Sequence, residues 1–166
     1  IPIIASAMDA IVSPNTAIQM NDLGGLAVMN LEGIQTKYRN PDDILAQIAE
    51  SPAEKATALL QKFYAAPIKE ELVADRIQQI KSGNAKCAVS MTPVNTKRLA
   101  EIAVEAGADV IVVQSTVTTA RHISRSVRGL IFSDLLKTVK VPILVGNCVG
   151  YRAALELMET GISGVL

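Results

Sequence analysis

Residues that could bind a small polar ligand follow each of five short apolar runs in the sequence. All of them except one Met and one Gly carry a hydroxyl, amide or carboxyl group. In the order of the runs they are Ser6, Met8 and Asp9; Asn30 and Glu32; Ser90 and Thr92; Gln114, Ser115 and Thr116; Gly146 and Asn147. Hydroxyl and amide groups suit the ribose, phosphate and base edges of a nucleotide, but the set offers no obvious general base and no metal-ligand cluster. Alternatively they are capping and turn residues, because strand-to-helix loops favour Ser, Thr and Asn.

The apolar runs themselves predict strands, because each is short, rich in β-branched residues and flanked by turn residues. They lie at 2–5, 25–29, 86–90, 109–113, 141–145 and 162–166. The segments between them carry helix signals, such as the apolar face from Leu99 to Ala106 that stops at Gly107. Regular alternation of strand and helix is typical of right-handed βαβ units on a parallel sheet, so the predicted fold class is α/β.

The spacing of the units favours a barrel. Six units in 166 residues average about 28 residues each, close to the roughly 31 of a complete eight-unit barrel. The chain is therefore expected to form part of a (β/α)8 TIM barrel, strands one to six. A doubly wound sheet is the weaker alternative, since no Gly-x-Gly-x-x-Gly follows the first strand. In a barrel the residues that follow the strands converge on one mouth.

The longest interval between strands, residues 31–85, is predicted to be a helical connection and not a second domain, so that residues 1–166 form one domain. Ser13, Ser51 and Thr92 each precede a Pro and are predicted N-caps, and Glu54 would complete a capping box with Ser51. The charged residues near the end of this interval are expected to form a solvent-exposed helix face: Lys69, Glu70, Glu71, Asp75 and Arg76.

Composition excludes several classes of function. The 16 Lys and Arg residues balance 16 Asp and Glu residues, which argues against a nucleic-acid or anionic-membrane partner. No apolar run approaches the roughly 20 residues of a membrane-spanning helix. Two cysteines without a pairing pattern fit a reducing compartment, so a soluble, cytoplasmic protein is expected. The single His122 lacks metal-ligand spacing and is expected, with Arg121, Arg125 and Arg128, on an exposed helix or loop.

Two runs are more specific than residue types alone. Ile3-Ile4-Ala5-Ser6-Ala7-Met8-Asp9 ends the first strand in a small-Ser-small-Met-Asp motif, and Asp22-Leu23-Gly24-Gly25-Leu26-Ala27-Val28 places Leu-Gly-Gly before the second strand. Together with 105–110 and 141–147, these runs make the sequence resemble the IMP dehydrogenase/GMP reductase family over essentially its whole length. It is most similar to the shorter members, because 31–85 is too short for the paired regulatory modules that many IMP dehydrogenases insert there.

The resemblance implies a substrate site for a purine nucleotide monophosphate, IMP. Ser6 and Met8 match the family's contacts to this nucleotide, and Asp9 matches the neighbouring acid of the motif. Asn147 matches an Asn close to the reacting base and the nicotinamide, and Gly146 before it is interpreted as letting the backbone approach the ligand.

The resemblance also implies a cofactor site for NAD at Gln114, Ser115 and Thr116, which match a segment that the family uses toward the dinucleotide. Here the sequence departs from the family's pattern, since Gln114 replaces the usual Asp and substitutes a neutral group for a charged acceptor. Leu166 also lies where many members carry an Arg.

In the family, a Cys on the loop after strand six attacks C2 of the purine, hydride passes to NAD, and water releases the product. The chain is expected to be a fragment that stops before this loop, so no catalytic residue is predicted within it and it should be inactive alone. Cys87 and Cys148 do not match the position and are predicted to be small buried apolar side chains. No metal site is predicted.

The function implied is an oxidoreductase of purine biosynthesis that oxidises IMP to XMP with NAD, toward GMP, and that is a homo-oligomer, commonly a tetramer, at full length. One alternative is a GMP reductase that uses NADPH. Another is a non-catalytic purine-nucleotide-binding paralogue, which the departures at Gln114 and Leu166 would favour.

Overall fold

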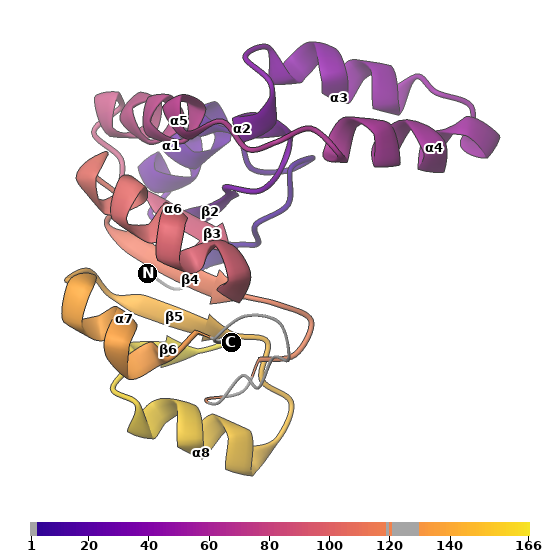
Figure 1. Ribbon diagram of the computed structural model, residues 1–166. Helices are drawn as coiled ribbons and strands as arrows, with labels where there is room; N and C mark the ends of the chain where they lie inside the picture. The colour runs from indigo at the N-terminus through magenta and orange to yellow at the C-terminus, as the bar shows by residue number, and fades with distance from the viewer. Residues whose placement is uncertain (1–2, 119, 121–129) are drawn as a thin grey trace.

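Six parallel strands form a sheet whose order follows the sequence (Figure 1) in the computed structural model, which describes residues 3–118, 120 and 130–166. The strands are β1 (Ile4–Ala5), β2 (Leu26–Asn30), β3 (Ala88–Met91), β4 (Val110–Gln114), β5 (Ile143–Gly146) and β6 (Gly164–Val165). Each overlaps its predicted range and begins one or two residues later. The predicted strands are therefore confirmed in number, order and direction within the described residues.

Alternate residues of each strand face opposite sides of the sheet, as strand geometry requires. Val28, Ala88 and Val112 form a small apolar cluster inside the curl of the sheet. Their neighbours Met29, Val89 and similar residues join a larger core on the other side, beneath the helices. Both faces of the strands are thus apolar, which explains why they read as continuous hydrophobic runs.

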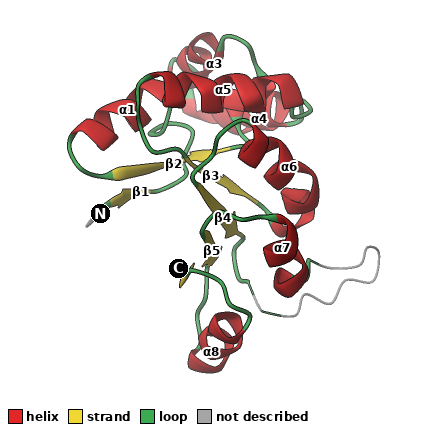
Figure 2. Ribbon diagram, turned by 90° about the vertical axis from the view of Figure 1, so that its left-hand side faces the viewer, coloured by secondary structure: helices red, strands yellow, loops and turns green. Residues whose placement is uncertain are grey.

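Helices cover the outer side of the curled sheet (Figure 2), so the predicted partial (β/α)8 barrel is confirmed. They are α1 (Pro14–Asp22), α5 (Glu70–Ser82), α6 (Pro93–Glu105), α7 (Phe132–Thr138) and α8 (Tyr151–Glu159). Between β2 and α5 lie three more helices, α2 (Ile34–Lys37), α3 (Pro41–Ala49) and α4 (Ala53–Tyr64). The antiparallel pair α3–α4 stands out from the rest of the molecule (Figure 1).

The predicted helix starts are correct in two cases and wrong in one. Ser13 caps α1 and accepts from the Thr16 N–H, and Thr92 occupies the N-cap position of α6. Ser51 does not cap α4, which begins at Ala53 after Pro52. The N-cap position is taken by Pro52, and the Ser51 hydroxyl instead donates back to the Ile48 carbonyl at 2.8 Å, at the end of α3.

The exposed helix face predicted for α5 is correct for Lys69, Glu70, Glu71 and Asp75 but wrong for Arg76, which is only 8% exposed. Its guanidinium donates to three backbone carbonyls in and directly after α2, those of Gln35 at 2.9 Å, Tyr38 at 3.2 Å and Arg39 at 2.8 Å. The buried Arg76 side chain therefore holds α2 and the residues after it against α5, which the local charge pattern could not reveal.

At the amino ends of the strands, Asp109 joins three elements. Its carboxylate accepts hydrogen bonds from the Cys87 N–H at 2.8 Å, from Lys81 at 2.7 Å and from Lys86 at 3.3 Å. Partial burial opposes ionisation, but these three donors outweigh it and lower the pKa of Asp109 below its ordinary value. The network fixes the starts of β3 and β4 relative to α5.

None of the helices among the described residues combines the length and the apolar character needed to cross a bilayer. The expectation for His122 and its neighbouring arginines concerns residues 121–129, which lie outside the described part of the chain.

Candidate functional site

A cavity of about 200 Å³ opens at the carboxyl ends of the strands. Three of the residues predicted from the sequence, Ser6, Gln114 and Asn147, contribute to its wall, each directly after or at the end of a strand. Its remaining lining is apolar: Ile4, Ala7, Val28, Val112, Leu144 and Leu166. An apolar chamber with a few converging polar groups is the usual form of a small-molecule site, so this mouth is the candidate functional site.

Gln114 and Asn147 form a direct amide pair in this mouth. The Gln114 side-chain nitrogen donates to Asn147 Oδ1 at 3.1 Å. Gln114 lies opposite Gly146 in the β4–β5 ladder, and the ladder continues past the strands, with the Ser115 N–H donating to the Gly146 carbonyl and the Asn147 N–H to the Ser115 carbonyl. The pair therefore has a fixed position, and it leaves the Gln114 carbonyl oxygen and the Asn147 amide nitrogen for a ligand.

Thr118 is a residue of this region that the sequence prediction missed. It is only 5% exposed, its hydroxyl donates to the Gly146 carbonyl at 2.6 Å, and its N–H donates to the Asn147 carbonyl at 2.9 Å. The predicted residues beside it differ, because Thr116 is exposed and the Ser115 hydroxyl is occupied by the Val117 carbonyl at 2.9 Å. Thr118 thus holds Gly146 and Asn147 in place. Its only signal in the sequence was its position, two residues after the Gln114-Ser115-Thr116 run.

Gly146 is required by its neighbour on the sheet. A Cβ at this position would lie 2.5 Å from the Leu166 Cβ and 3.0 Å from the Leu166 carbonyl oxygen. Leu166 is held there because its N–H donates to the Val145 carbonyl and its carbonyl accepts from the Cys148 N–H at 2.7 Å. The interpretation that Gly146 admits a ligand is therefore not needed to explain this glycine, since close packing against Leu166 accounts for it.

Met8 and Asp9 lie at the other side of the mouth with different surroundings. Met8 is 49% exposed and does not line the cavity, although its neighbours Ser6 and Ala7 do. Asp9 is 9% exposed, and its carboxyl oxygen Oδ2 accepts from the Ile34 N–H at 2.9 Å and from the Tyr64 hydroxyl at 2.5 Å. Asp9 thus serves as an internal anchor and Met8 as a surface residue.

The two cysteines occupy unlike environments. Cys87 is fully buried next to β3, and this burial, together with the nearby Asp109 and against the effect of Lys81, raises the pKa of its thiol to about 12. The prediction of a buried apolar side chain is correct for Cys87. It is not correct for Cys148, which is half-buried after β5 and whose sulfur lies 3.6 Å from the Gly150 carbonyl.

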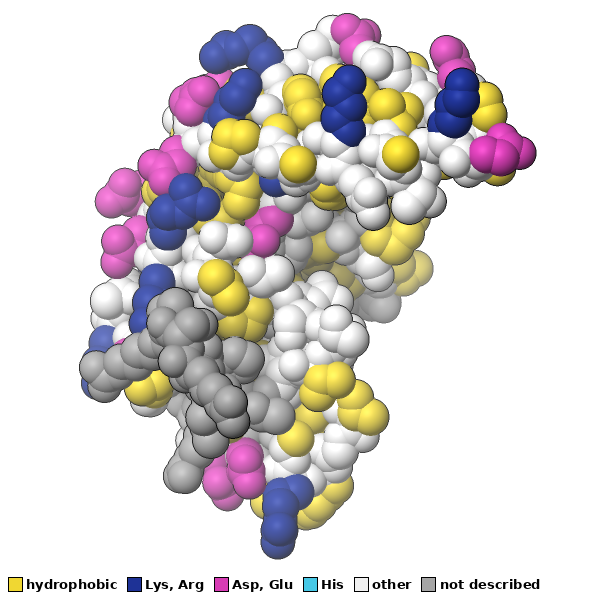
Figure 3. Space-filling view, turned by 45° about the vertical axis from the view of Figure 1, so that its right-hand side comes forward, with side chains coloured by type: hydrophobic (Ala, Val, Ile, Leu, Met, Phe, Trp, Pro, Cys, Tyr) yellow, Lys and Arg dark blue, Asp and Glu magenta, His cyan; other side chains and the backbone are white. Residues whose placement is uncertain are grey.

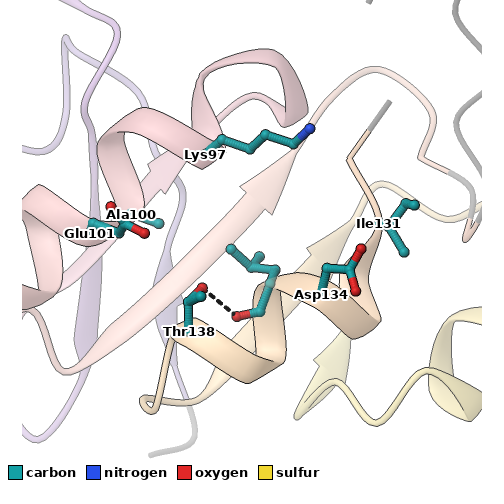
Figure 4. A pocket seen from close by; sticks show the side chains of 7 residues that line it. Lys97, Ala100, Glu101, Ile131, Asp134 and Thr138 are labelled. Carbon is teal, nitrogen blue, oxygen red and sulfur yellow. Dashed lines mark hydrogen bonds between the residues drawn. The ribbon is translucent and has the colours of Figure 1, made fainter. Parts of the chain in front are cut away.

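Other cavities lie outside the barrel and do not collect the predicted residues. One of about 320 Å³ separates α6 from α7, and Figure 4 shows Lys97 and Glu101 on one side of it and Asp134 and Thr138 on the other. It lies in the helical layer, and none of the predicted site residues lines it. Within the described chain no group of three or more His, Cys, Asp or Glu residues could hold a metal ion. On the face seen in Figure 3, charges of both signs are interspersed over the helices.

The chain belongs to the IMP dehydrogenase/GMP reductase family. Residues 1–166 match the family described as the IMP dehydrogenase / GMP reductase domain. An uncharacterised oxidoreductase of Mycolicibacterium smegmatis and one of Mycobacterium tuberculosis are each 34% identical over 171 residues, covering all of this chain and 46% of the relative. The chain thus spans about half the length of the curated relatives it matches.

A solved structure agrees with this assignment. The crystal structure of an IMP dehydrogenase/GMP reductase-like protein from Corynebacterium glutamicum has a TM-score of 0.91 and 32% sequence identity to the chain, and the match covers 99% of this chain and 44% of that one. The fold and the family predicted from the sequence are therefore both confirmed.

Proposed function

We propose that the protein containing this chain is an IMP dehydrogenase-type oxidoreductase that oxidises IMP to XMP with NAD in GMP biosynthesis. The observation that carries the proposal is the convergence of Ser6, Gln114 and Asn147 on one cavity at the carboxyl ends of the strands, in a chain of this family. The relatives named as oxidoreductases support a redox reaction.

In this proposal the substrate residues are Ser6, Met8, Gly146 and Asn147. The exposed Ser6 hydroxyl can donate to or accept from a phosphate or ribose oxygen, and the Met8 side chain offers a polarisable apolar surface to a purine ring. The Asn147 amide nitrogen, which its partner Gln114 leaves available, can donate to the purine base. Each group binds and orients the nucleotide without itself reacting.

The proposed cofactor residues are Gln114, Ser115 and Thr116. Their fit to a nicotinamide nucleotide rests on neutral polar groups: the Gln114 carbonyl oxygen and the exposed Thr116 hydroxyl can pair with a carboxamide or with ribose hydroxyls. Ser115 contributes mainly by shaping the loop, because its hydroxyl is bonded to the Val117 carbonyl. A bound NAD would supply the hydride acceptor.

We further propose that residues 1–166 form one partial-barrel, nucleotide-binding domain without a second domain. Neither cysteine suits a nucleophile's position, because Cys87 is buried and neither thiol lines the cavity, so the reacting thiol would come from another part of the protein. The proposed full-length protein is a cytoplasmic homo-oligomer, a tetramer as in the family, that binds neither nucleic acid nor membranes.

The test is NADH formation by the intact reading frame supplied with IMP and NAD. Asn147→Ala should lower kcat/KM by at least about 100-fold, because it removes the amide donor proposed to face the purine base and unpairs Gln114. The matched control is Asn15→Ala, which deletes an amide from an exposed position of α1 and should leave the rate unchanged.

Two results would replace this function by its alternatives. NADPH consumption with GMP, and no NADH from IMP, would assign a GMP reductase. Tight IMP binding without turnover in either direction would assign a non-catalytic paralogue, the alternative that the departures at Gln114 and Leu166 favour.

A further inference from the structure

The end of the α3–α4 pair reaches the loop that follows β1. Tyr64, the last residue of α4, donates its hydroxyl proton to Asp9 Oδ2 at 2.5 Å across 55 residues of sequence. The same oxygen accepts the Ile34 N–H at 2.9 Å, at the start of α2. One carboxyl group therefore joins the β1 loop, the β2 loop and α4.

The Asp9 carboxyl group has little freedom to move. A Cβ at Gly33 would overlap both of its oxygens, so this group is seated directly against the backbone of the β2 loop. Its other oxygen, Oδ1, is buried without a hydrogen-bond partner among the described residues. Because Oδ2 carries both hydrogen bonds, loss of the Tyr64 donor would leave the carboxyl group with a single protein donor.

Asp9 in turn fixes the residue before it. The Met8 N–H donates to the Ser6 carbonyl at 2.8 Å, and the Met8 carbonyl accepts from the N–H groups of Ile11 at 2.9 Å and Val12 at 2.8 Å. Residues 6–12 therefore form a chain of tight turns whose side-chain anchor is Asp9. A shift of this anchor moves Met8 and Ser6, the two residues proposed to hold the nucleotide.

The end of α4 is also held in ways that do not involve Asp9. The Tyr38 hydroxyl donates to the Phe63 carbonyl at 3.1 Å, the two rings pack edge to face at 5.8 Å, and the Lys37 ammonium donates to the Ala66 carbonyl at 2.6 Å. Removing the Tyr64 hydroxyl alone therefore leaves the helix end in place and isolates the contact to Asp9.

We propose that Tyr64 is a positioning residue for the nucleotide: through Asp9 it fixes the loop that carries Ser6 and Met8, and so makes nucleotide affinity depend on the placement of the α3–α4 pair. The proposal rests on the proposed function for its ligand, but the contact between Tyr64 and Asp9 does not depend on that function.

The experiment compares Tyr64→Phe with Tyr38→Phe in the full reading frame. Both variants delete one tyrosine hydroxyl bond at the same end of α4, but only the first touches Asp9. Tyr64→Phe should raise the calorimetric Kd and the KM for IMP about 10-fold, as expected for losing one hydrogen bond to a charged group, with kcat within about 2-fold. Tyr38→Phe should change the Kd by less than about 2-fold while lowering Tm comparably.

Two further measurements separate positioning from general damage. In an Asp9→Ala background Tyr64→Phe should weaken IMP binding by less than about 2-fold, because the carboxyl group through which Tyr64 acts is gone. In the absence of any nucleotide, amide hydrogen exchange in residues 8–12 should be at least about 5-fold faster in Tyr64→Phe and unchanged in Tyr38→Phe.

The exchange measurement also keeps the two proposals distinct. If the wild-type protein fails to bind IMP, the proposed function is wrong, and the exchange rates still decide whether Tyr64 holds the loop. Unchanged exchange in Tyr64→Phe, or equal loss of IMP affinity in both tyrosine variants, would overturn the positioning role.

Discussion

At the amino ends of the strands, the Asp109 carboxylate accepts from Lys81, Lys86 and the Cys87 N–H, whereas at the carboxyl ends Gln114 and Asn147 meet as two neutral amides. At the amino ends, the Asp109 carboxylate is paired with donors of the protein itself. At the carboxyl ends, the amide pair leaves the Asn147 nitrogen as a donor and the Gln114 oxygen as an acceptor for another molecule. In the proposed function, the amino end of this barrel therefore serves stability and the carboxyl end serves binding.

Thiol chemistry should show the largest difference between the two ends. Cys87, at the amino end, is buried with a pKa of about 12, whereas Cys148, at the mouth, is half-buried. At pH 8, iodoacetamide followed by peptide mass spectrometry should label Cys148 at least about 1,000-fold faster than Cys87, because burial both raises the pKa of the Cys87 thiol and blocks access to its sulfur. The urea-unfolded chain is the control, in which both should react alike. Comparable rates in the folded protein would contradict the burial of Cys87.

Asp9 should be an exception to this division, since it lies at the carboxyl ends of the strands but contributes to stability as an internal anchor. Asp9→Ala leaves the buried Ile34 N–H without its acceptor and deletes the Tyr64 contact. The free energy of unfolding of the full-length protein should fall by about 3 kcal/mol in urea titrations. Asp22→Ala, an exposed carboxyl deletion, should change it by less than about 0.5 kcal/mol.

Asp109→Ala should lower stability without weakening nucleotide binding, because the change lies at the amino end. The expected loss is about 2 kcal/mol near neutral pH. Since the folded pKa of Asp109 is lowered, its contribution is present above the ordinary Asp pKa of about 4 and is lost as the pH falls below it. Urea midpoints of wild type and variant should therefore converge in acid. Glu105→Ala, which deletes an exposed carboxyl from the end of α6, should not reproduce the effect.

Thr118→Val should give the smallest stability change. It tests whether side-chain hydrogen bonds, in addition to the backbone ladder, hold Gly146 in place. The variant keeps the shape of the side chain and deletes the hydroxyl that bonds the Gly146 carbonyl and contacts the Ser115 hydroxyl at 3.1 Å, so the free energy of unfolding should fall by about 1 kcal/mol. Thr116→Val is the matched change at an exposed position and should leave the urea midpoint unchanged. Equal midpoints for both variants would mean that the ladder alone fixes Gly146.

The strands and their order were predictable because they depend on local patterns. Apolar runs between turn residues located β1 to β6, and barrel geometry then brought Ser6, Gln114 and Asn147 to one end. The short Ser-x-Met-Asp motif further identified the family.

The contacts that hold the site were not predictable, because they join distant residues. Nothing in the neighbourhood of Asp9 indicates Tyr64, 55 residues away, and the charge pattern of α5 concealed that Arg76 turns inward to three carbonyls. The reason for Gly146 likewise lies in a distant residue, Leu166, which follows β6. Such pairings depend on tertiary structure, which overrides local pattern.

The backbone bonds that continue past the ends of β4 and β5 have a consequence for affinity. Because Ser115, Asn147 and Thr118 already exchange main-chain bonds, their dihedral angles are restricted before any ligand arrives. Ordering one residue's backbone on binding costs about 1–2 kcal/mol of conformational entropy. A ligand that enters this mouth avoids most of that cost on the β4–β5 side, so even a few weak polar contacts there can contribute measurably to its binding free energy.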